Sequence, residues 1–368
     1  MNLKKKQNKT QKDVEKAVKA GRRLKKKNAK LFYTAIAFIV IASVTVGVLY
    51  ACYPDWFKGK MPAPGATLTV HFIDVGQGDA IYIRFPSGKD MLIDAGTVKK
   101  SENEFNFTDG APVTTDENAL VTEYIKRYDD NGTLDYLLIT HSDSDHISYV
   151  DEVLEAFQVN TVYLPYIDIE VFDTSADEGE KTAFEGGLKI TTATYENIAA
   201  AVFNEPNCTV KCVNGYFSIK IEEDISFEVF SFDKTEYSEK NITDANELSP
   251  ICLLRYARRT VVLTGDAEKK SEKDFIGDCL PVDCDVLKVG HHGSDSSTTQ
   301  DFLNHIKVEY AVISAGNHGS FNHPKQSILD RLKTNNIKYY CTRYNGSVTL
   351  TIDHKGNIYF DCAIGAAA

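Results

Sequence analysis

Residues Leu134–His146 read LDYLLITHSDSDH, in which a run of mostly apolar residues leads directly into a cluster of imidazoles and carboxylates. The apolar run predicts a buried strand that ends at His141. The His-x-Asp-x-Asp-His motif that follows can converge on a divalent cation, which a lone histidine cannot do. Its two acids make the site harder than an all-imidazole site and so favour Mn²⁺ alongside Zn²⁺. Taken alone, the motif is also compatible with a solvated polar loop.

Two further groups of candidate ligands follow predicted strands. Leu263–Asp266 (LTGD) ends one strand, and Lys288–Ser294 (KVGHHGS) follows another. Either motif alone is compatible with an ordinary turn. Active residues of an α/β domain collect on loops at the carboxyl ends of its strands. The three motifs together therefore predict one dinuclear site, which requires about five to seven ligands.

The chain after residue 66 alternates predicted strands and helices, which indicates an α/β fold. Residues 68–86 (LTVHFIDVGQGDAIYIRFP) predict two strands joined by a glycine-rich turn, and Lys89–Gly96 (KDMLIDAG) predicts a third. Residues 97–116 and 165–200 are predicted insertions that reshape the substrate cleft.

The motifs, taken in order, resemble one known family. The set HFIDVGQGDA, MLIDAG, ITHSDSDH, LTGD, KVGHHGS and SAGNHGSFNHP resembles the extracellular metallo-β-lactamase domain of the ComEC competence (DNA-uptake) family, over Leu68–Phe360. The resemblance implies a four-layer αββα sandwich over residues 66–368 and a metal-dependent nuclease that acts on the DNA strand that is not taken up. The HHG and TGD motifs also resemble secreted phosphorylcholine esterases, which cleave a phosphodiester on cell-wall polymers. The many membrane helices and the small β-domain of competence channels have no counterpart in this sequence, so DNA import itself is not implied.

The resemblance implies a centre of two divalent metal ions, Mn²⁺ or Zn²⁺. A hydroxide that bridges the metals would attack phosphorus in line. Asp145 would orient or deprotonate this nucleophile, and His291 would face the substrate phosphate; these two are the implied catalytic residues. The implied ligands are His141 and Asp143 for one metal, Asp145, His146 and His292 for the other, and Asp266 as the bridge. Which of the two adjacent histidines is the ligand is left open, with His292 favoured.

The resemblance also implies residues outside the ligand set. Asp94 would anchor the ligand loop from behind. Asn246 and Ser249 stand where zinc β-lactamases have a histidine, which weakens the first metal site. Asn317 and His323 belong to the last motif of the family; His323 would lie in an outer shell or contact substrate, and a surface histidine is the alternative.

The N-terminal segment has a different composition from the rest of the chain. Residues 1–30 hold 13 Lys/Arg and two acids, a net charge of +11, whereas the remainder holds 28 bases and 50 acids, a net charge of −22. Residues 31–54 contain no charged residue and are long enough to cross a bilayer. We therefore expect a basic cytoplasmic arm, a single transmembrane signal anchor, a Pro/Gly linker over 55–65 and an extracellular body at the cell membrane. The alternatives are a cleaved signal peptide and, less favoured, a lipoprotein modified at Cys52.

The cysteines leave two alternatives open. Seven of the eight follow the predicted membrane segment. Cys208 with Cys212 and Cys279 with Cys284 could form disulfides in an extracellular body, and buried free thiols are the other possibility, above all for Cys252.

The charge of the body bears on the substrate. The resemblance favours DNA, but a net charge of −22 repels a polyanion unless cations gather at the cleft. Lys288, Lys325 and Arg343 are the best candidates for phosphate contacts, with Arg255, Arg258 and Arg259 on the hairpin before Asp266. The main prediction is thus a membrane-anchored phosphodiesterase or nuclease. The alternatives are a hydrolase of another ester, such as a cell-wall polymer substituent, and a non-catalytic, metal-stabilised sensor domain.

The predicted topology can be tested on intact cells. Added protease should digest residues 55–368 and leave a short protected fragment, which an antibody against the basic arm would detect by immunoblot. Complete protection of the body would contradict the predicted orientation.

Overall fold

The computed structural model describes residues 64–96, 121–129, 131–172, 180–183, 187–189, 192–237, 240–316 and 322–364, all within one compact unit, Gly59–Ala368. The predicted basic arm, the membrane segment, most of the linker and the insertion 97–116 lie outside the described residues, and so does Asn317. No helix among the described residues combines the length and apolar character needed to cross a membrane.

The first of two large sheets has eight strands in the order β17-β16-β1-β2-β3-β4-β5-β8. Because β3, β4 and β5 are parallel, their carboxyl ends meet at one edge. The strands are β1 (Thr67–Phe72), β2 (Ile81–Arg84), β3 (Asp90–Ile93), β4 (Thr133–Leu138), β5 (Gln158–Pro165), β8 (Thr209–Val213), β16 (Val348–Asp353) and β17 (Ile358–Cys362). The two strands predicted on either side of the glycine-rich turn are confirmed as β1 and β2, and the strand predicted within Lys89–Gly96 is confirmed as β3.

The second sheet has seven strands in the order β15-β14-β13-β12-β11-β10-β9, of which β12 to β15 are parallel. They are β9 (Phe217–Glu222), β10 (Ile225–Phe230), β11 (Ile251–Tyr256), β12 (Arg259–Leu263), β13 (Val286–Lys288), β14 (Tyr310–Ile313) and β15 (Lys338–Cys341). A separate hairpin, β6 (Ile169–Phe172) and β7 (Glu180–Ala183), lies within the predicted insertion 165–200.

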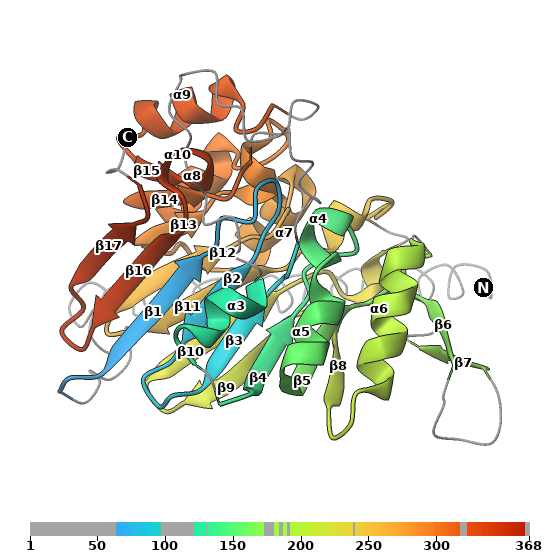
Figure 1. Ribbon diagram of the computed structural model, residues 1–368. Helices are drawn as coiled ribbons and strands as arrows, with labels where there is room; N and C mark the ends of the chain where they lie inside the picture. Colours follow the sequence, from blue (N-terminus) through green and yellow to red (C-terminus); the bar gives the residue numbers. More distant parts are fainter. Residues whose placement is uncertain are drawn as a thin grey trace, which may run out of the picture. The chain divides into compact units, whose positions relative to one another are not determined.

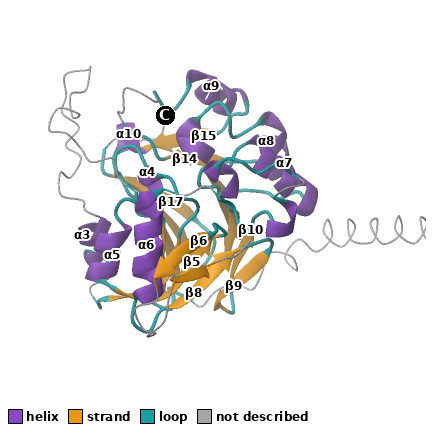
Figure 2. Ribbon diagram, turned by 90° about the vertical axis from the view of Figure 1, so that its right-hand side faces the viewer, coloured by secondary structure: helices purple, strands orange, loops and turns teal. Residues whose placement is uncertain are grey.

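Helices cover the outer face of each sheet, which confirms the predicted four-layer αββα sandwich (Figures 1 and 2). α3 (Val121–Lys126), α5 (Val150–Ala156) and α6 (Ala193–Asn204) cover the first sheet, and α7 (Lys269–Asp278), α8 (Gln300–Ile306) and α9 (Gln326–Thr334) cover the second. The short helices are α4 (Ser144–Ile147) and α10 (Thr342–Asn345), with 3-10 turns η1 (Lys234–Glu236), η2 (Ala245–Leu248) and η3 (Gly290–Gly293).

The alternation of side chains along the strands produces three apolar cores. Leu68, Val70 and Phe72 of β1 face Phe227 and Val229 of β10 in the core between the sheets. The opposite faces of the two sheets pack on their helices as two further cores. All seven cysteines that follow the membrane segment are free thiols, and Cys252, Cys284 and Cys341 are buried. The free-thiol alternative is therefore the one that the structure has.

The loop after β3 packs tightly against α4. The Ala95 N–H donates to the His146 carbonyl at 2.8 Å, and the Gly96 N–H donates to the Asp79 carbonyl at 2.9 Å. A Cβ atom on Gly96 would lie 1.5 Å from the Asp145 carbonyl oxygen. Glycine is required here for space, so that the loop after β3, which carries Asp94, can lie in backbone contact with α4, which carries Asp145 and His146.

Gly96→Ala tests this close approach. Since the loop must shift, we expect a loss of roughly 1–3 kcal/mol in unfolding free energy, measured as a lower urea midpoint. Gly277→Ala in α7 is the matched control, because its Cβ would meet nothing within 4 Å; there alanine should add about 0.5–1 kcal/mol. Equal midpoints for the two variants would contradict the packing described.

Candidate metal centre

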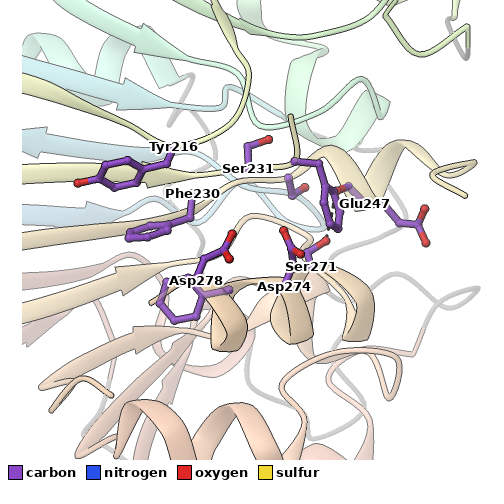
Figure 3. Close-up of a pocket in the computed structure, with 10 residues that line it drawn as sticks. Tyr216, Phe230, Ser231, Glu247, Ser271, Asp274 and Asp278 are labelled. Atoms are coloured by element: carbon purple, nitrogen blue, oxygen red, sulfur yellow. Dashed lines mark hydrogen bonds between the residues drawn. The ribbon is translucent and has the colours of Figure 1, made fainter. Parts of the chain in front are cut away.

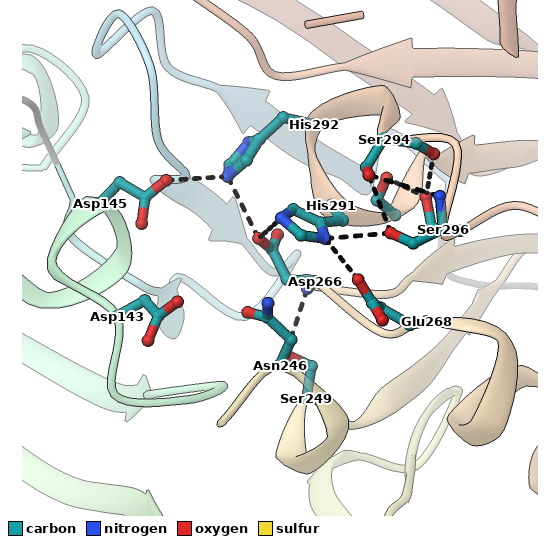
Figure 4. A network of polar contacts seen from close by, with 12 residues as sticks. Asp143, Asp145, Asn246, Ser249, Asp266, Glu268, His291, His292, Ser294 and Ser296 are labelled. Carbon is teal, nitrogen blue, oxygen red and sulfur yellow. Dashed lines mark hydrogen bonds and ion pairs between the residues drawn. The ribbon is translucent and has the colours of Figure 1, made fainter. Parts of the chain in front are cut away.

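The side chains predicted to bind metal come together where the carboxyl ends of strands from the two sheets meet. Figure 4 shows Asp143, Asp145, Asp266 and His292 among them. His141 and Asp143 follow β4, and Asp145 and His146 lie in α4. Asp266 follows β12, and His292 lies in η3 after β13. The first sheet thus supplies one half of the centre, and the second sheet supplies the other.

Asp94 orients His146 from behind. Its buried carboxylate accepts the Nδ1–H of His146 at 2.8 Å and two hydrogen bonds from Thr140, at 2.8 Å from the amide and 2.7 Å from the hydroxyl. Asp94 has a φ of 58°, a left-handed conformation that aspartate tolerates better than most residues. The Nε2 lone pair of His146 is therefore directed into the centre.

The other two candidate imidazole ligands are oriented in the same way. Nδ1 of His292 donates to the Ser314 carbonyl at 2.9 Å. Nδ1 of His141 lies 3.0 Å from the Thr140 hydroxyl and 3.1 Å from that of Ser249. Because the Thr140 hydroxyl donates to Asp94, it can accept from His141. In each ring the acceptor at Nδ1 leaves Nε2 as the unprotonated donor atom, as metal-ligating histidines require.

The donor atoms then converge at metal-ligand spacing. Nε2 of His146 is 3.2 Å from Asp266 Oδ1 and 3.2 Å from Nε2 of His292. Nε2 of His292 is 3.3 Å from Asp266 Oδ2 and 3.2 Å from Asp145 Oδ2. Ligand atoms around a tetrahedral Zn²⁺ lie about 3.3 Å apart, since each is about 2.0–2.1 Å from the ion. Asp266 directs Oδ1 toward His146 and Oδ2 toward His292, a position that suits a ligand shared by two metal ions.

The electrostatics of the centre also favour a cation. Burial lowers the pKa of His146 and His292, but the surrounding carboxylates outweigh it, raising the pKa of His146 well above its ordinary value and that of His292 to about 10. For Asp266, burial raises the pKa, but the two rings lower it well below its usual range. A potential that holds protons on these rings also favours a divalent cation that displaces them.

The half of the centre nearest η2 has a different donor set. Nε2 of His141 and Oδ1 of Asn246 are buried and have no hydrogen-bond partner among the described residues, and Asp143 Oδ2 lies 3.8 Å from that Nε2. Figure 4 shows the Asn246 side chain extending into the space beside Asp143 and Asp266. Ser249 instead braces the centre, because its hydroxyl contacts His141 and accepts the Asp266 N–H at 3.2 Å. A site with one imidazole and several oxygen donors suits Mn²⁺ better than an all-imidazole site does.

Two adjacent histidines point in different directions because both adopt left-handed backbone conformations, with φ of 45° at His291 and 52° at His292. His292 is buried in the centre. The side chain of His291 is 22% exposed, its Nδ1 contacts Glu268 at 2.9 Å and its Nε2 lies 3.7 Å from Asp266. The His323 ring is buried and lies 5.6 Å from that of His291, and burial followed by the two nearby histidines lowers its pKa to about 4. The geometry thus favours His292 as the ligand and places His291, which is partly exposed, on the solvent side of the centre.

Asp79 and Glu268 lie near the centre but were given no role from the sequence, and Lys288 has a different role from the one predicted. Asp79, with His146, Asp266 and His292, forms a buried group whose candidate ligand atoms all lie within 4.8 Å of one another. Lys288, predicted to contact phosphate, is fully buried and pairs with Asp79 at 2.7 Å, so that prediction is wrong. Glu268 holds His291. Asp79 lies in the quoted GQGD turn, but nothing in a single sequence indicates what its side chain faces.

A pocket borders the centre at Ser249 (Figure 3). Its lining includes the aromatic rings of Tyr216, Phe230 and Phe275 and the carboxylates of Glu247, Asp274 and Asp278. Glu247 pairs with Lys270 at 2.5 Å, and Asp274 pairs with Lys240. This side of the centre is therefore aromatic and acidic rather than basic.

The family model that matches this chain agrees with its fold. Residues 73–227 match the family model described as the metallo-beta-lactamase superfamily. "ComE operon protein 3" of Bacillus subtilis is 28% identical over 284 residues, covering 76% of this chain and 32% of its own length. "Recombination protein 2" of Haemophilus influenzae is 23% identical over 276 residues, covering 74% of this chain and 27% of its own length. Among solved structures, the metallo-beta-lactamase fold protein YhfI from Bacillus subtilis covers 80% of this chain and 100% of its own at 10% identity, with a TM-score of 0.43.

The chain carries a metallo-β-lactamase superfamily domain. More particularly, the chain is similar to metallo-β-lactamase-fold proteins of the ComEC competence type, the family that its motifs resemble. The chain spans about a third or less of the length of these curated relatives.

Asp266→Asn tests the shared ligand. Because the amide keeps the shape of the side chain but loses its charge, we expect metal content to fall by at least half and activity to be lost. Metal content is measured by mass spectrometry of the elements after gel filtration. Asp361→Asn, on the exposed side of β17, is the control and should keep both. Wild-type metal content and rate in Asp266→Asn would make the Thr-Gly-Asp sequence an ordinary turn.

Proposed function

We propose that this protein is a metal-dependent phosphodiesterase, most favourably a nuclease that acts on DNA. The observation that carries the proposal is the convergence of the Nε2 atoms of His146 and His292 with the carboxylates of Asp145 and Asp266 at 3.2–3.3 Å spacing. We propose further that residues 31–54 anchor the chain in the cell membrane and that the body lies outside, because the uncharged span follows a strongly basic arm.

Different residues of the centre have different proposed roles in hydrolysis. Divalent cations, when bound, supply Lewis acidity toward a phosphoryl oxygen and lower the pKa of a water molecule. Asp145 is a candidate to orient this water and take its proton, because its side chain is 22% exposed and lies 3.2 Å from Nε2 of His292. His291 is placed to contact the substrate phosphate, since Glu268 fixes its ring and leaves Nε2 toward the solvent side of the centre.

DNA would approach from the side of His323. Lys325 and Arg343, named here the basic rim, are half-buried there; the Arg343 guanidinium donates to the His323 carbonyl at 3.2 Å. The Lys325 charge is close enough to lower the pKa of His323. The arginines of the β11–β12 hairpin lie at the far end of β12 from Asp266, where Arg259 pairs with Asp285 at 2.7 Å. The basic rim thus lies beside His323, whose ring is 5.6 Å from that of His291.

The second candidate is a phosphodiesterase for a cationic or zwitterionic ester, such as a cell-wall polymer substituent. The observation that favours it is the aromatic and acidic pocket beside Ser249, since aromatic faces and carboxylates attract cations and repel phosphate. A non-catalytic sensor domain is the least supported alternative, because it has no need for a carboxylate that reaches solvent as Asp145 does.

One set of assays separates these functions. The full chain, purified in detergent and loaded with Mn²⁺ or Zn²⁺, is given DNA, bis-p-nitrophenyl phosphate and a choline phosphodiester. Metal-dependent cleavage of DNA or of bis-p-nitrophenyl phosphate supports the proposal. A metal-loaded chain that cleaves none of the three overturns it.

The double variant Lys325→Met/Arg343→Met tests DNA as the substrate. We expect KM for DNA to rise about 10-fold or more, with little change for bis-p-nitrophenyl phosphate. The slope of log(kcat/KM) against log salt should fall by about one for each lost phosphate contact. Arg258→Met/Lys307→Met removes the same charge elsewhere and is the control. A flat salt response in wild type and variants alike would favour the cationic ester.

A further inference from the structure

Asp79 and Lys288 form a fully buried ion pair directly beside the centre, with 2.7 Å between Asp79 Oδ2 and Lys288 Nζ. Burying a lysine and a carboxylate costs free energy that their attraction repays only with good geometry. Replacing such a pair by apolar residues is often neutral or stabilising, so stability alone does not account for its presence here. The contacts of each partner show what else it does.

Asp79 is attached to the first half of the centre through its backbone. Its N–H donates to the Asp145 carbonyl at 3.1 Å, and its carbonyl accepts the Gly96 N–H at 2.9 Å. The preceding residue, Gly78, lies so close to α4 that a Cβ there would be 2.4 Å from the Asp145 oxygen. The turn that carries Asp79 therefore fixes the position of the Asp145 backbone beyond the end of β4.

Lys288 is attached to the second half. It is the last residue of β13, four residues before His292, and its carbonyl accepts the hydroxyl of Thr264 at 2.8 Å. Thr264 stands two residues before Asp266. The Lys288 ammonium also donates to the Val289 carbonyl at 2.9 Å, which fixes its end of the ion pair.

We infer that the Asp79–Lys288 pair is a brace that sets the distance between the two ligand groups. The pair completes a series of contacts that runs from Asp145 through Asp79, Lys288 and Thr264 to the loop of Asp266. It thereby connects the first sheet to the second beside the candidate metal centre. Both residues are positioning residues. The inference rests on the proposed metal-dependent function, but it concerns metal binding rather than the substrate.

Direct ligation by Asp79 is the competing explanation. Within the described part of the chain its Oδ1 is buried without a hydrogen-bond partner, and Asp79 belongs to the compact group with His146, Asp266 and His292. That oxygen, however, lies 4.0 Å from Nδ1 of His292, the nitrogen that donates to Ser314, and not on the Nε2 side of the ring. The carboxylate that does face Nε2 is that of Asp145, at 3.2 Å.

The test uses Co²⁺ as the probe, because its visible absorption reports the ligand geometry directly. Asp79→Asn, Lys288→Met and the double variant are made in the full chain, purified metal-free in detergent and titrated with Co²⁺. Asp285→Asn/Arg259→Met removes a more exposed ion pair of the same 2.7 Å length at the opposite end of β12 and is the control for loss of an ion pair away from the centre. Thermal unfolding of each metal-free protein is recorded alongside.

If the pair is a brace, each single variant weakens Co²⁺ binding by about 10–100-fold and alters the spectrum. The double variant should bind no more weakly than either single variant, because the two residues act as one unit. The metal-free double variant should nevertheless unfold at a higher temperature than either single variant, since no lone charge stays buried. Stability would thus recover without recovery of the metal site.

Two results would overturn the inference. Lys288→Met that binds Co²⁺ as wild type does, while Asp79→Asn does not, would make Asp79 a ligand and Lys288 its counter-ion. Wild-type binding and spectra in all variants would make the pair structural only. Failure of the proposed function gives a different result, in which wild type binds Co²⁺ but cleaves no phosphodiester.

Discussion

The orientation of three buried imidazole rings is the constraint on which the rest of the centre depends. Each ring is held at Nδ1 by an acceptor that belongs to the fold: the Asp94 carboxylate for His146, the Ser314 carbonyl for His292, and hydroxyls for His141. With the outer nitrogens occupied, the inner lone pairs of His146 and His292 face each other at 3.2 Å, a distance that only a cation or a proton makes favourable. The strained backbones of Asp94, His291 and His292 are local costs of this arrangement, which the packing of strand ends around them offsets.

The second general feature is the division of the centre between the sheets. Parallel strands bring Asp94 and His141 to one edge and Asp266 and His292 to the facing edge, so neither sheet holds the complete ligand set. The distance between the halves is consequently a property of the packing between the sheets. The hydroxyl of Ser249, which contacts His141 and accepts the Asp266 N–H, crosses this boundary, and so does the Asp79–Lys288 ion pair.

Much of this arrangement was predictable from the sequence, for a physical reason. Strands with alternating or continuous apolar residues, each followed by His, Asp or Gly, predict both the sheets and the edge where ligands gather, so the six candidate ligands were named in advance. Lys288 was misassigned because a lysine next to a histidine pair resembles a phosphate contact, whereas its burial depends on β13 being covered on both faces. Glu268 was missed for a similar reason: its contact with His291 arises from the left-handed turn of η3, which no residue pattern specifies.

The pairing of β1 with β16 has a consequence for how the chain is made. Thr67 lies opposite Asp353, so β1 gains its outer neighbour only after the intervening residues, which include the whole second sheet, have been synthesised. Until then one edge of the first sheet exposes unpaired amides and carbonyls, a template for association with other chains. Messages cut short before the codons for β16 would therefore yield polypeptides that contain every candidate ligand and yet are prone to aggregate. For this fold, the chain is most prone to aggregate during the time in which the strands of the second sheet and then β16 are being synthesised.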